Sequence, residues 1–242
     1  MWIKVCGVSR AADVAAIVDA GADAIGLNFF PGSKRYVSVA DARRLIGLAQ
    51  CAATGVSPVD FVGVFVDSEA AVVRKTVNEA GLSVIQIHGQ ESVEQVAKIH
   101  CLCPDIPLVR AFRTDPNDLK RILADIDRLS ALVPLAAVLL DAYVPGEFGG
   151  TGRTVDLCLL ETYFLQPRPP LILAGGLTPE NVAEAAARPN LWGIDTASGV
   201  ESSPGIKDAA RICEFVSRAR GAVSRLSGCD RLIRIGKSRS AP

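Results

Sequence analysis

An alternation between short apolar runs and segments with helical spacing constrains this chain more than any other feature. The apolar runs are IKVC, AIGLN, FVGVFV, VIQIH, PLVRAF, LAAVLLD, LILAGG and WGID. Between them, apolar residues recur three and four positions apart, as at Ile122, Leu123 and Ile126, which predicts amphipathic helices. Continuous apolar strands separated by helices are typical of a parallel sheet covered by helices.

The number of these units favours a closed barrel. We expect residues 1–222 to form one α/β domain, a (β/α)8 TIM barrel. The alternative is an open flavodoxin-like or Rossmann sheet, which normally has fewer units. The turn Cys6-Gly7-Val8-Ser9 also lacks the G-x-G-x-x-G pattern of a dinucleotide-binding site.

Capping residues predict several helix ends. Ser38, and Thr178 before a proline, are expected to start helices, whereas Gly21 and Gly81 are expected to end them in the left-handed conformation. Beyond residue 222 the alternation lapses into a basic segment. We interpret residues 223–242 as a flexible tail outside the barrel.

The bulk composition excludes several classes of partner and location. The chain has 26 basic and 26 acidic residues, so its charge suggests neither a nucleic acid nor a membrane surface as the main partner. Its seven cysteines are odd in number and irregularly spaced, which is typical of reduced thiols in the cytoplasm. The sequence shows neither a secretory n-region nor an apolar run long enough for a membrane span.

Two reactive side chains end strands at the predicted mouth of the barrel, Cys6 on the first strand and Asp141 on the sixth. A lone cysteine is more often a small hydrophobic residue, and a lone aspartate is often structural. The two strands, however, lie three steps apart in a ring of eight, so inward-facing side chains would face each other across a substrate. Partial desolvation is expected to raise the pKa of Asp141, which suits a general acid opposite a general base.

Glycine-containing turns after the seventh and eighth strands predict an anion site. In this fold these loops commonly bind phosphate through backbone N–H groups, which makes Gly175, Gly176, Ser198 and Gly199 the expected contacts. The alternative is that these turns only require positive φ angles.

Two other loops lie at the same end of the predicted barrel. The segment YVPGEFGGTGR, with Gly149, Gly150, Thr151 and Gly152, suits a mobile cover over bound ligand or a plain connector. Arg35, in FFPGSKRYVS, offers a guanidinium for a substrate carboxylate, although a solvated surface arginine is the default interpretation. His100-Cys101-Leu102-Cys103 lacks a second cluster and lies towards the opposite end, so no metal site is expected.

The motifs together resemble one known family. In order along residues 2 to about 220 they are KVCGVS, SKRYVS, IQIHGQE, LLDA, GGTGRTVDL, LAGGLTPENV and DTASGVESSPGIKD. The sequence closely resembles the phosphoribosylanthranilate isomerases of tryptophan biosynthesis. This resemblance implies an Amadori rearrangement of the small phosphorylated aminosugar N-(5-phosphoribosyl)anthranilate to the 1-deoxyribulose 5-phosphate derivative, without metal or organic cofactor.

The resemblance also implies residue roles. Cys6 would be the general base and Asp141 the general acid, while Arg35 would hold the anthranilate carboxylate and the two turns the ribose phosphate. The pocket would be completed by Gln86, His88 and Asp195. The chain departs from the family pattern at Lys34, Ala197-Ser198, Val155 and Leu157, which affects loop rigidity and packing more than proton transfer.

A cysteine that acts as a base must be a thiolate, which is a minor species near neutral pH at its ordinary pKa of about 8.5. We therefore expect nearby positive charge to lower the pKa of Cys6. Period-two alternation places Lys4 on the same face of the strand, where its ammonium can pair with Asp195 or act on the thiol.

Three alternatives stay open. One is another phosphoribosyl isomerase of this barrel group, such as a ProFAR isomerase or a dual-specificity enzyme. That group uses aspartates at the ends of strands one and five, where this chain has Cys6 and Ala111-Phe112-Arg113. The others are a non-catalytic phosphate-binding barrel and a structural partner of another pathway enzyme, which the combination of Cys6 with Asp141 disfavours. Whether the chain works free or with other tryptophan-pathway enzymes is also open.

Overall fold

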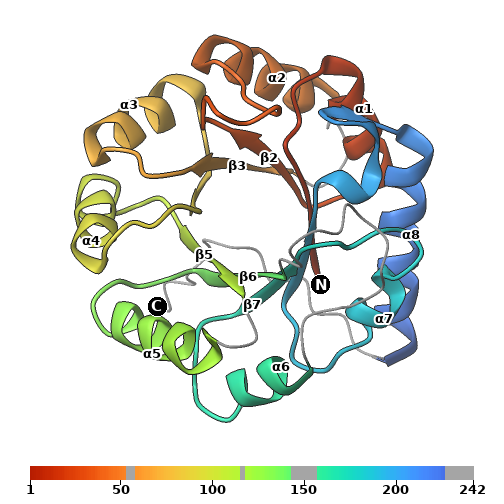
Figure 1. Cartoon of the computed structure of the whole chain (residues 1–242). Coiled ribbons are helices and arrows are strands. Elements are labelled where there is room, and N and C mark those ends of the chain that lie inside the picture. Colours follow the sequence, from red (N-terminus) through yellow and green to blue (C-terminus); the bar gives the residue numbers. More distant parts are fainter. Residues whose placement is uncertain (53–57, 115–117, 143–156, 227–242) are drawn as a thin grey trace, which may run out of the picture.

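A computed structural model describes residues 1–52, 58–114, 118–142 and 157–226. Each of the eight apolar runs contributes a parallel strand, and the strands close into a barrel in the order β1 to β8 (Figure 1). This confirms the predicted TIM barrel. The strands are β1 (Trp2–Cys6), β2 (Ala24–Asn28), β3 (Asp60–Phe65), β4 (Val84–Ile87), β5 (Leu108–Thr114), β6 (Ala137–Ala142), β7 (Leu171–Ala174) and β8 (Gly193–Thr196).

The helices form an outer ring around the strands (Figure 1). They are α1 (Ala11–Ala20), α2 (Val39–Ala52), α3 (Ala70–Ala80), α4 (Val93–Leu102), α5 (Leu119–Ser130), α6 (Leu157–Tyr163), α7 (Val182–Ala186) and α8 (Ala209–Leu226). Helix α8 packs beside α1. Arg220 on α8 also forms an ion pair of 2.6 Å with Asp23, the residue just before β2. The helix thus continues four residues past the predicted boundary at 222.

The predicted capping residues agree with the structure. Gly21 and Gly81 end α1 and α3 with φ angles of 76° and 78°, and the Ser38 hydroxyl accepts a hydrogen bond from the third residue beyond it. At Thr178 the hydroxyl accepts from the N–H of Glu180 at 3.3 Å and the N–H donates to the side chain of Asn181 at 2.8 Å, as in a helix cap. A turn follows, and the regular helix α7 begins at Val182.

The strands present alternate residues to two separate cores. Outward residues such as Ile3 and Val5 pack under the helices, in the larger core. The inward side chains form a smaller core inside the barrel: Trp2, Ala24, Val62, Val84, Val109, Ala111, Ala137, Leu139, Ile172 and Ala174. This alternation leaves the next inward positions, towards the carboxyl ends of the strands, for polar side chains.

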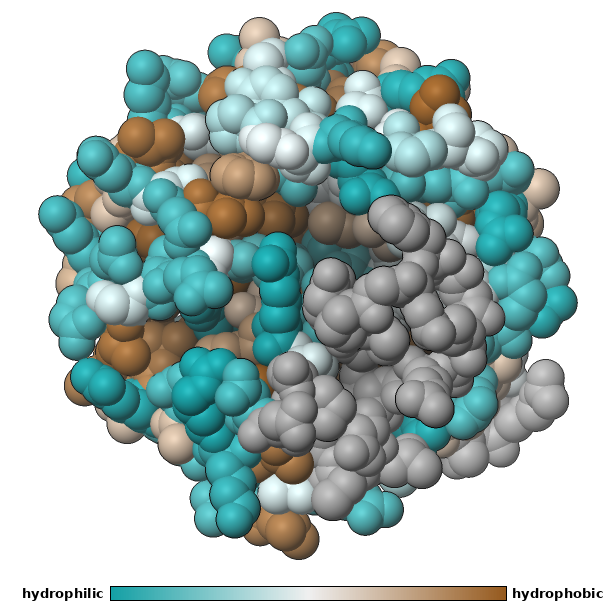
Figure 2. All heavy atoms as spheres, in the orientation of Figure 1, coloured by the Kyte–Doolittle hydropathy of each residue, from teal (hydrophilic) through white to brown (hydrophobic). Residues whose placement is uncertain are grey.

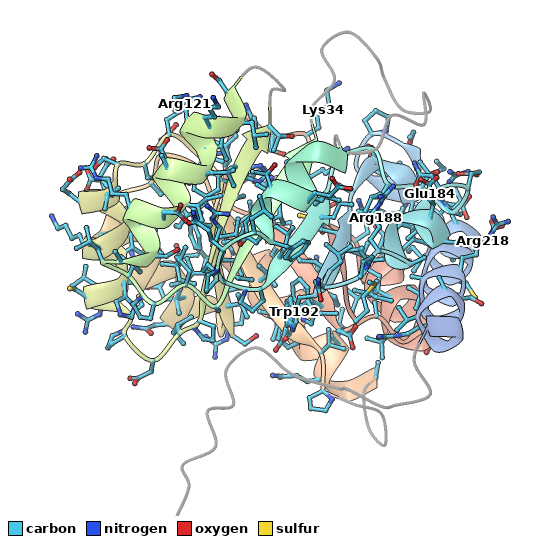
Figure 3. The ribbon with its side chains drawn as sticks, turned by 90° about the horizontal axis from the view of Figure 1, so that it is seen from below. Lys34, Arg121, Glu184, Arg188, Trp192 and Arg218 are labelled. Carbon is cyan, nitrogen blue, oxygen red and sulfur yellow. The ribbon has the colours of Figure 1, made fainter. Side chains whose placement is uncertain are left out.

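The two ends of the barrel differ in character. At the amino ends of the strands the indoles of Trp2 and Trp192 stack with their centroids 5.2 Å apart. Figure 3 shows Trp192 at this end and Lys34 and Arg121 at the other. In the space-filling view of the carboxyl-end face, polar side chains make up most of the rim (Figure 2).

A short hairpin follows β8 at the carboxyl end. After the 3-10 turn η2 (Ser198–Val200) come β9 (Glu201–Ser203) and β10 (Ile206–Lys207), which pair antiparallel. Gly205 makes the reversal with a φ angle of 84°. Across the described ranges, no helix is both long enough and apolar enough to cross a bilayer.

Candidate active site

The strand ends bring the predicted polar residues to one mouth. Cys6 is the last residue of β1, and Asp141 is the fifth of six residues in β6. Strands β1 and β6 are three steps apart around the closed barrel, by way of β8 and β7. Cys6 is partly exposed and the side chain of Asp141 is 28% exposed, so both can be reached by a ligand.

A buried ion pair lies beside the thiol. The Nζ of Lys4 is 2.8 Å from Oδ2 of Asp195, with the two side chains 0% and 8% exposed, which confirms that Lys4 faces inward and pairs with Asp195. The ammonium also lies close enough to the sulfur of Cys6 to act on the pKa of the thiol. The other carboxylate oxygen of Asp195 is buried and has no partner among the described residues, so it is available to accept a hydrogen bond from a ligand.

The prediction of a lowered thiol pKa is wrong. Burial raises the pKa of Cys6, and Asp195 adds to this effect because a second negative charge disfavours the thiolate. Lys4 and Lys207 lower the pKa but do not outweigh burial. The expected positive charge is therefore present, while the neutral thiol is still the favoured form.

Gly26 makes room for the thiol. It pairs with Cys6 in the register of β1 and β2. A Cβ at this position would lie 2.8 Å from the sulfur of Cys6 and 3.0 Å from Cε of Lys4, closer than side chains normally pack. The absence of a side chain at Gly26 thus lets the thiol and the ammonium meet.

His88 joins β4 to Asp141. It follows β4 directly, and its Nδ1 is 3.2 Å from Nε2 of Gln86, which is buried. Its Nε2 is 3.4 Å from Oδ2 of Asp141. When the amide of Gln86 donates to Nδ1, a neutral imidazole carries its proton on Nε2, facing the carboxyl group of Asp141.

Arg35 is half-buried and already holds a carboxylate. Its Nε and Nη2 bond the two oxygens of Glu201 at 2.6 and 2.7 Å, and Lys207 bonds Glu201 at 2.9 Å. Although burial opposes it, hydrogen bonds from the two cations bring the pKa of Glu201 below its ordinary value. Burial lowers the pKa of Lys207 in spite of Glu201.

Sequence reasoning missed Glu201 and Lys207. The signal was present as an acidic residue in the turn after the eighth strand, followed six positions later by a lysine across Pro204-Gly205. The hairpin β9–β10 brings the two side chains together. Their partner Arg35 comes from the loop after β2, so this ion cluster joins two sides of the mouth.

The two predicted phosphate-binding turns lie against each other. Gly175 and Gly176 have φ angles of 89° and 63°, as the simpler interpretation of these glycines also requires. The hydroxyl of Thr196 donates to the carbonyl of Leu177 at 2.7 Å, and a Cβ at Gly199 would collide with the same carbonyl. The turns after β7 and β8 are thus held together, as a shared anion site requires.

Gly149, Gly150, Thr151 and Gly152 lie outside the described residues. In the described part of the chain, no group of three or more His, Cys, Asp or Glu side chains is placed to hold a metal ion.

The comparisons with known proteins decide the family. The model of the N-(5'phosphoribosyl)anthranilate (PRA) isomerase family matches residues 3–218. This chain belongs to that family. Membership makes it an isomerase of tryptophan biosynthesis with the TIM-barrel fold.

Individual relatives agree along nearly the whole chain. The N-(5'-phosphoribosyl)anthranilate isomerase of Cellvibrio japonicus is 40% identical over 229 residues, covering 94% of this chain and 97% of the relative. The crystal structure of the enzyme from Thermotoga maritima is 34% identical with a TM-score of 0.75, covering 91% of this chain and 99% of that one. A second crystal structure of a phosphoribosyl anthranilate isomerase, 32% identical with a TM-score of 0.72 and coverages of 91% and 99%, contains reduced 1-(o-carboxyphenylamino)-1-deoxyribulose 5-phosphate.

Proposed function

We propose that this chain catalyses the Amadori rearrangement of N-(5-phosphoribosyl)anthranilate to 1-(2-carboxyphenylamino)-1-deoxyribulose 5-phosphate, with Cys6 as general base and Asp141 as general acid. The observation that carries this assignment of roles is the placement of both groups, accessible, at the carboxyl ends of β1 and β6. The ligand of the crystallised relative, a reduced form of this product, supports the substrate class.

The first step opens the sugar ring. The carboxyl group of Asp141 donates its proton to the furanose ring oxygen as the bond from C1 to that oxygen breaks, and the bonding electrons stay on the oxygen. The lone pair of the anilino nitrogen forms a C=N bond to C1, which gives an iminium. His88 lies beside this acid, with its Nε2 at 3.4 Å from Oδ2 of Asp141 and not hydrogen-bonded to it.

The second step removes the proton on C2. The thiolate of Cys6 takes this proton, the electrons of the C–H bond form a C1=C2 double bond, and the iminium becomes a neutral enolamine. The enolamine then tautomerises to the ketone. Because the pKa of the thiol is raised, the thiolate is a minor species at neutral pH. Each thiolate is nevertheless a stronger base than the thiolate of a thiol with a lowered pKa would be.

The ends of the substrate are held by separate groups. The paired turns at Gly175, Gly176, Ser198 and Gly199 bind the phosphate through backbone N–H groups. Arg35 binds the anthranilate carboxylate through Nη1, the part of its guanidinium that Glu201 does not hold. The unpartnered oxygen of Asp195 accepts from a sugar hydroxyl.

The chain works in the cytoplasm as a barrel followed by a basic tail. Cys6, Cys101, Cys103 and Cys213, in the described part of the chain, are free thiols, which fits a reducing compartment. The tail, residues 223–242 in the sequence interpretation, begins within the last turn of α8, and residues 227–242 lie outside the described ranges.

A turnover assay tests the function. We expect the purified chain to convert N-(5-phosphoribosyl)anthranilate to the ketose. The conversion is measured by chromatographic separation of substrate and product. The aminoaldose of the ProFAR reaction, offered in parallel, tests the dual-specificity alternative. Binding of the first substrate without conversion would refute the proposal and favour a non-catalytic barrel.

A further inference from the structure

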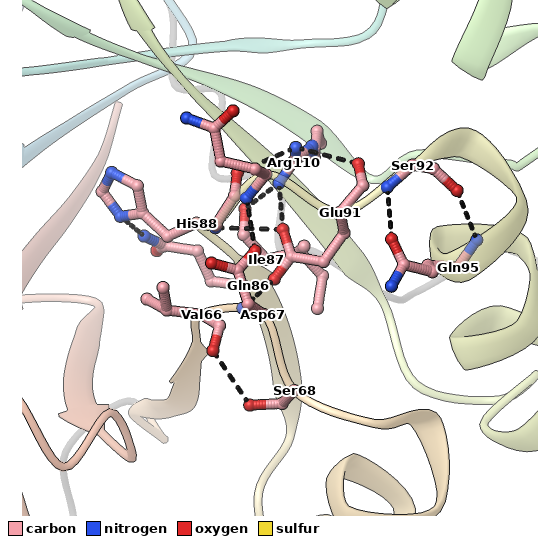
Figure 4. Close-up of polar contacts among 12 residues, drawn as sticks. Val66, Asp67, Ser68, Gln86, Ile87, His88, Glu91, Ser92, Gln95 and Arg110 are labelled. Atoms are coloured by element: carbon pink, nitrogen blue, oxygen red, sulfur yellow. Dashed lines mark hydrogen bonds and ion pairs between the residues drawn. The ribbon is translucent and has the colours of Figure 1, made fainter.

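A buried ion pair lies beneath the loop that carries His88. Arg110 is on β5 and Glu91 ends the loop after β4, and Nη1 of Arg110 is 2.8 Å from Oε2 of Glu91 (Figure 4). The two side chains are only 8% and 1% exposed. Each N–H group of an arginine buried this deeply needs a hydrogen-bond acceptor, because an unpaired buried donor costs free energy. The acceptors that Arg110 finds therefore show which parts of the chain it holds.

The pair holds the backbone on both sides of His88. Arg110 donates to the carbonyl of Ile87 at 3.2 Å and to that of Gly89 at 3.1 Å. The carboxylate of Glu91 accepts from the N–H of Gly89 at 3.0 Å. The residues immediately before and after His88 are thus fixed by one ion pair.

The neighbouring loop is fixed by the same carboxylate. The N–H of Asp67, after β3, donates to Oε1 of Glu91 at 2.7 Å, and the N–H of Gln90 donates to Asp67 at 2.6 Å. A Cβ at Gly89 would lie 2.5 Å from the nitrogen of Asp67 and 2.7 Å from Oε1 of Glu91. The loops are packed so closely that only glycine fits at position 89.

The segment after Glu91 is anchored as well. Ser92 begins α4 with a capping box, in which its hydroxyl accepts from the N–H of Gln95 and its N–H donates to the side chain of Gln95 at 2.7 Å (Figure 4). The loop from Ile87 to Ser92 therefore has fixed ends and a fixed centre. Figure 4 shows the imidazole of His88 on the side of this loop away from Arg110.

We propose that Arg110 and Glu91 are positioning residues, which fix the loop around His88 so that the imidazole stays between Gln86 and Asp141. This inference rests on the proposed role of Asp141 as the acid. The ion pair holds the backbone at Ile87 and Gly89, and this backbone determines the position of the His88 ring between them. The ring in turn faces the carboxyl group of Asp141 at 3.4 Å.

The chain offers a matched control at the other end of the barrel. Arg168 precedes β7, and its Nε and Nη2 bond the carboxylate of Asp127 on α5 at 2.6 and 2.8 Å. The side chain of Arg168 is 5% exposed and also donates to the carbonyls of Thr162 and Tyr163. This pair is likewise a buried guanidinium that bonds a carboxylate and two backbone carbonyls, but Asp127 is 43% exposed and the pair lies far from the mouth.

The experiment compares full-length Glu91→Gln, Arg110→Lys and Arg110→Met with Asp127→Asn. The readouts are kcat, KM, Tm, and NMR of the imidazole nitrogens. The chain has only two histidines, so His100 on α4 serves as the internal reference for His88.

We expect Glu91→Gln and Arg110→Met to lower kcat at least about ten-fold, because a misplacement of about 1 Å costs about a hundred-fold. KM is expected to change much less, and the His88 resonances to shift or broaden while those of His100 stay in place. Arg110→Lys keeps the charge and part of the bonding, so it should recover part of kcat. Asp127→Asn should lower Tm but leave kcat and the His88 resonances unchanged.

Unchanged His88 resonances in both Glu91→Gln and Arg110→Met would overturn the proposal, as would an equal loss of kcat in Asp127→Asn. If Glu91→Gln does not fold, the contrast between Arg110→Lys and Arg110→Met decides the question. Should the wild-type chain fail to turn over its substrate, the proposed function is wrong, yet the NMR comparison still decides whether the ion pair positions His88.

Discussion

Lys4 is the residue whose removal tests the chemistry of the site most directly. Its ammonium bonds Asp195 at 2.8 Å and lies near the sulfur of Cys6. Replacing it by methionine keeps the length of the side chain and removes both contacts. Because Lys4 is the largest influence that lowers the pKa of the thiol, the pKa of Cys6 should rise further above its ordinary value.

The magnitude follows from the contact. A unit charge about 4 Å away contributes roughly 4 kcal/mol at an effective dielectric constant of about 20, and about 1.4 kcal/mol corresponds to one pKa unit. Losing Lys4 also raises the pKa of Asp195, and a partly protonated Asp195 raises the thiol pKa less. We therefore expect the pKa of Cys6 to rise by at least about one unit. The thiolate forms only above the pKa of the thiol. The part of the profile of kcat/KM against pH that reports this pKa, called the thiol limb below, should therefore move to higher pH. At neutral pH the rate should fall at least about ten-fold.

Stability must be separated from this effect. Lys4→Met leaves Asp195 buried without its partner, which is expected to lower the free energy of unfolding by about 3–5 kcal/mol. The double variant Lys4→Met/Asp195→Asn removes both charges, so it should regain stability. Its thiol limb should nevertheless stay displaced, since the influence of Lys4 on the thiol exceeds that of Asp195.

The assay is kcat/KM against pH, corrected for the folded fraction by circular dichroism. A thiol limb at the wild-type position in the single variant would refute the role of Lys4 at the thiol. A thiol limb that returns to that position in the double variant would assign the effect to Asp195 instead.

The remaining predictions concern the proton-transfer pair, the carboxylate site and the room around the thiol. Cys6→Ser and Asp141→Asn should each lower kcat by about 10²- to 10⁴-fold while equilibrium binding of the ketose product is retained; loss of binding instead would make these residues structural. Arg35→Lys should raise KM by roughly ten-fold or more with a smaller change in kcat, because an ammonium lacks the planar fork; an unchanged KM would remove Arg35 from the carboxylate site. Gly26→Ala, whose Cβ would lie 2.8 Å from the sulfur, should cost about 1–3 kcal/mol of stability by denaturant unfolding and lower kcat/KM, and full activity would contradict the tight fit.

Hydrophobic periodicity was sufficient to predict the barrel. Each apolar run reports one strand, because a strand buried on both faces has little freedom in composition, and the number of units selects closure. The inward position of Lys4 followed from the same alternation. The capping pattern at Thr178 was also informative, since its hydroxyl accepts from the N–H of Glu180, although the regular helix α7 begins only at Val182.

The site was predictable in its positions but not in its electrostatics. Strand ends place Cys6 and Asp141 correctly, whereas the direction of the thiol pKa depends on the balance of burial against Lys4 and Lys207. That balance needs distances between segments about 200 residues apart in sequence, as from Cys6 to Lys207. The ion pairs of Glu201 and Glu91 escaped prediction for the same reason.

The stacked indoles of Trp2 and Trp192 have a consequence for turnover. They fill the amino end of the barrel interior, so the substrate enters and the ketose product leaves through the same mouth at the carboxyl end. A product molecule that is still bound at this mouth blocks the binding of the next substrate molecule. Product inhibition should accordingly be competitive, and exit of the ketose sets an upper bound on the cycling rate.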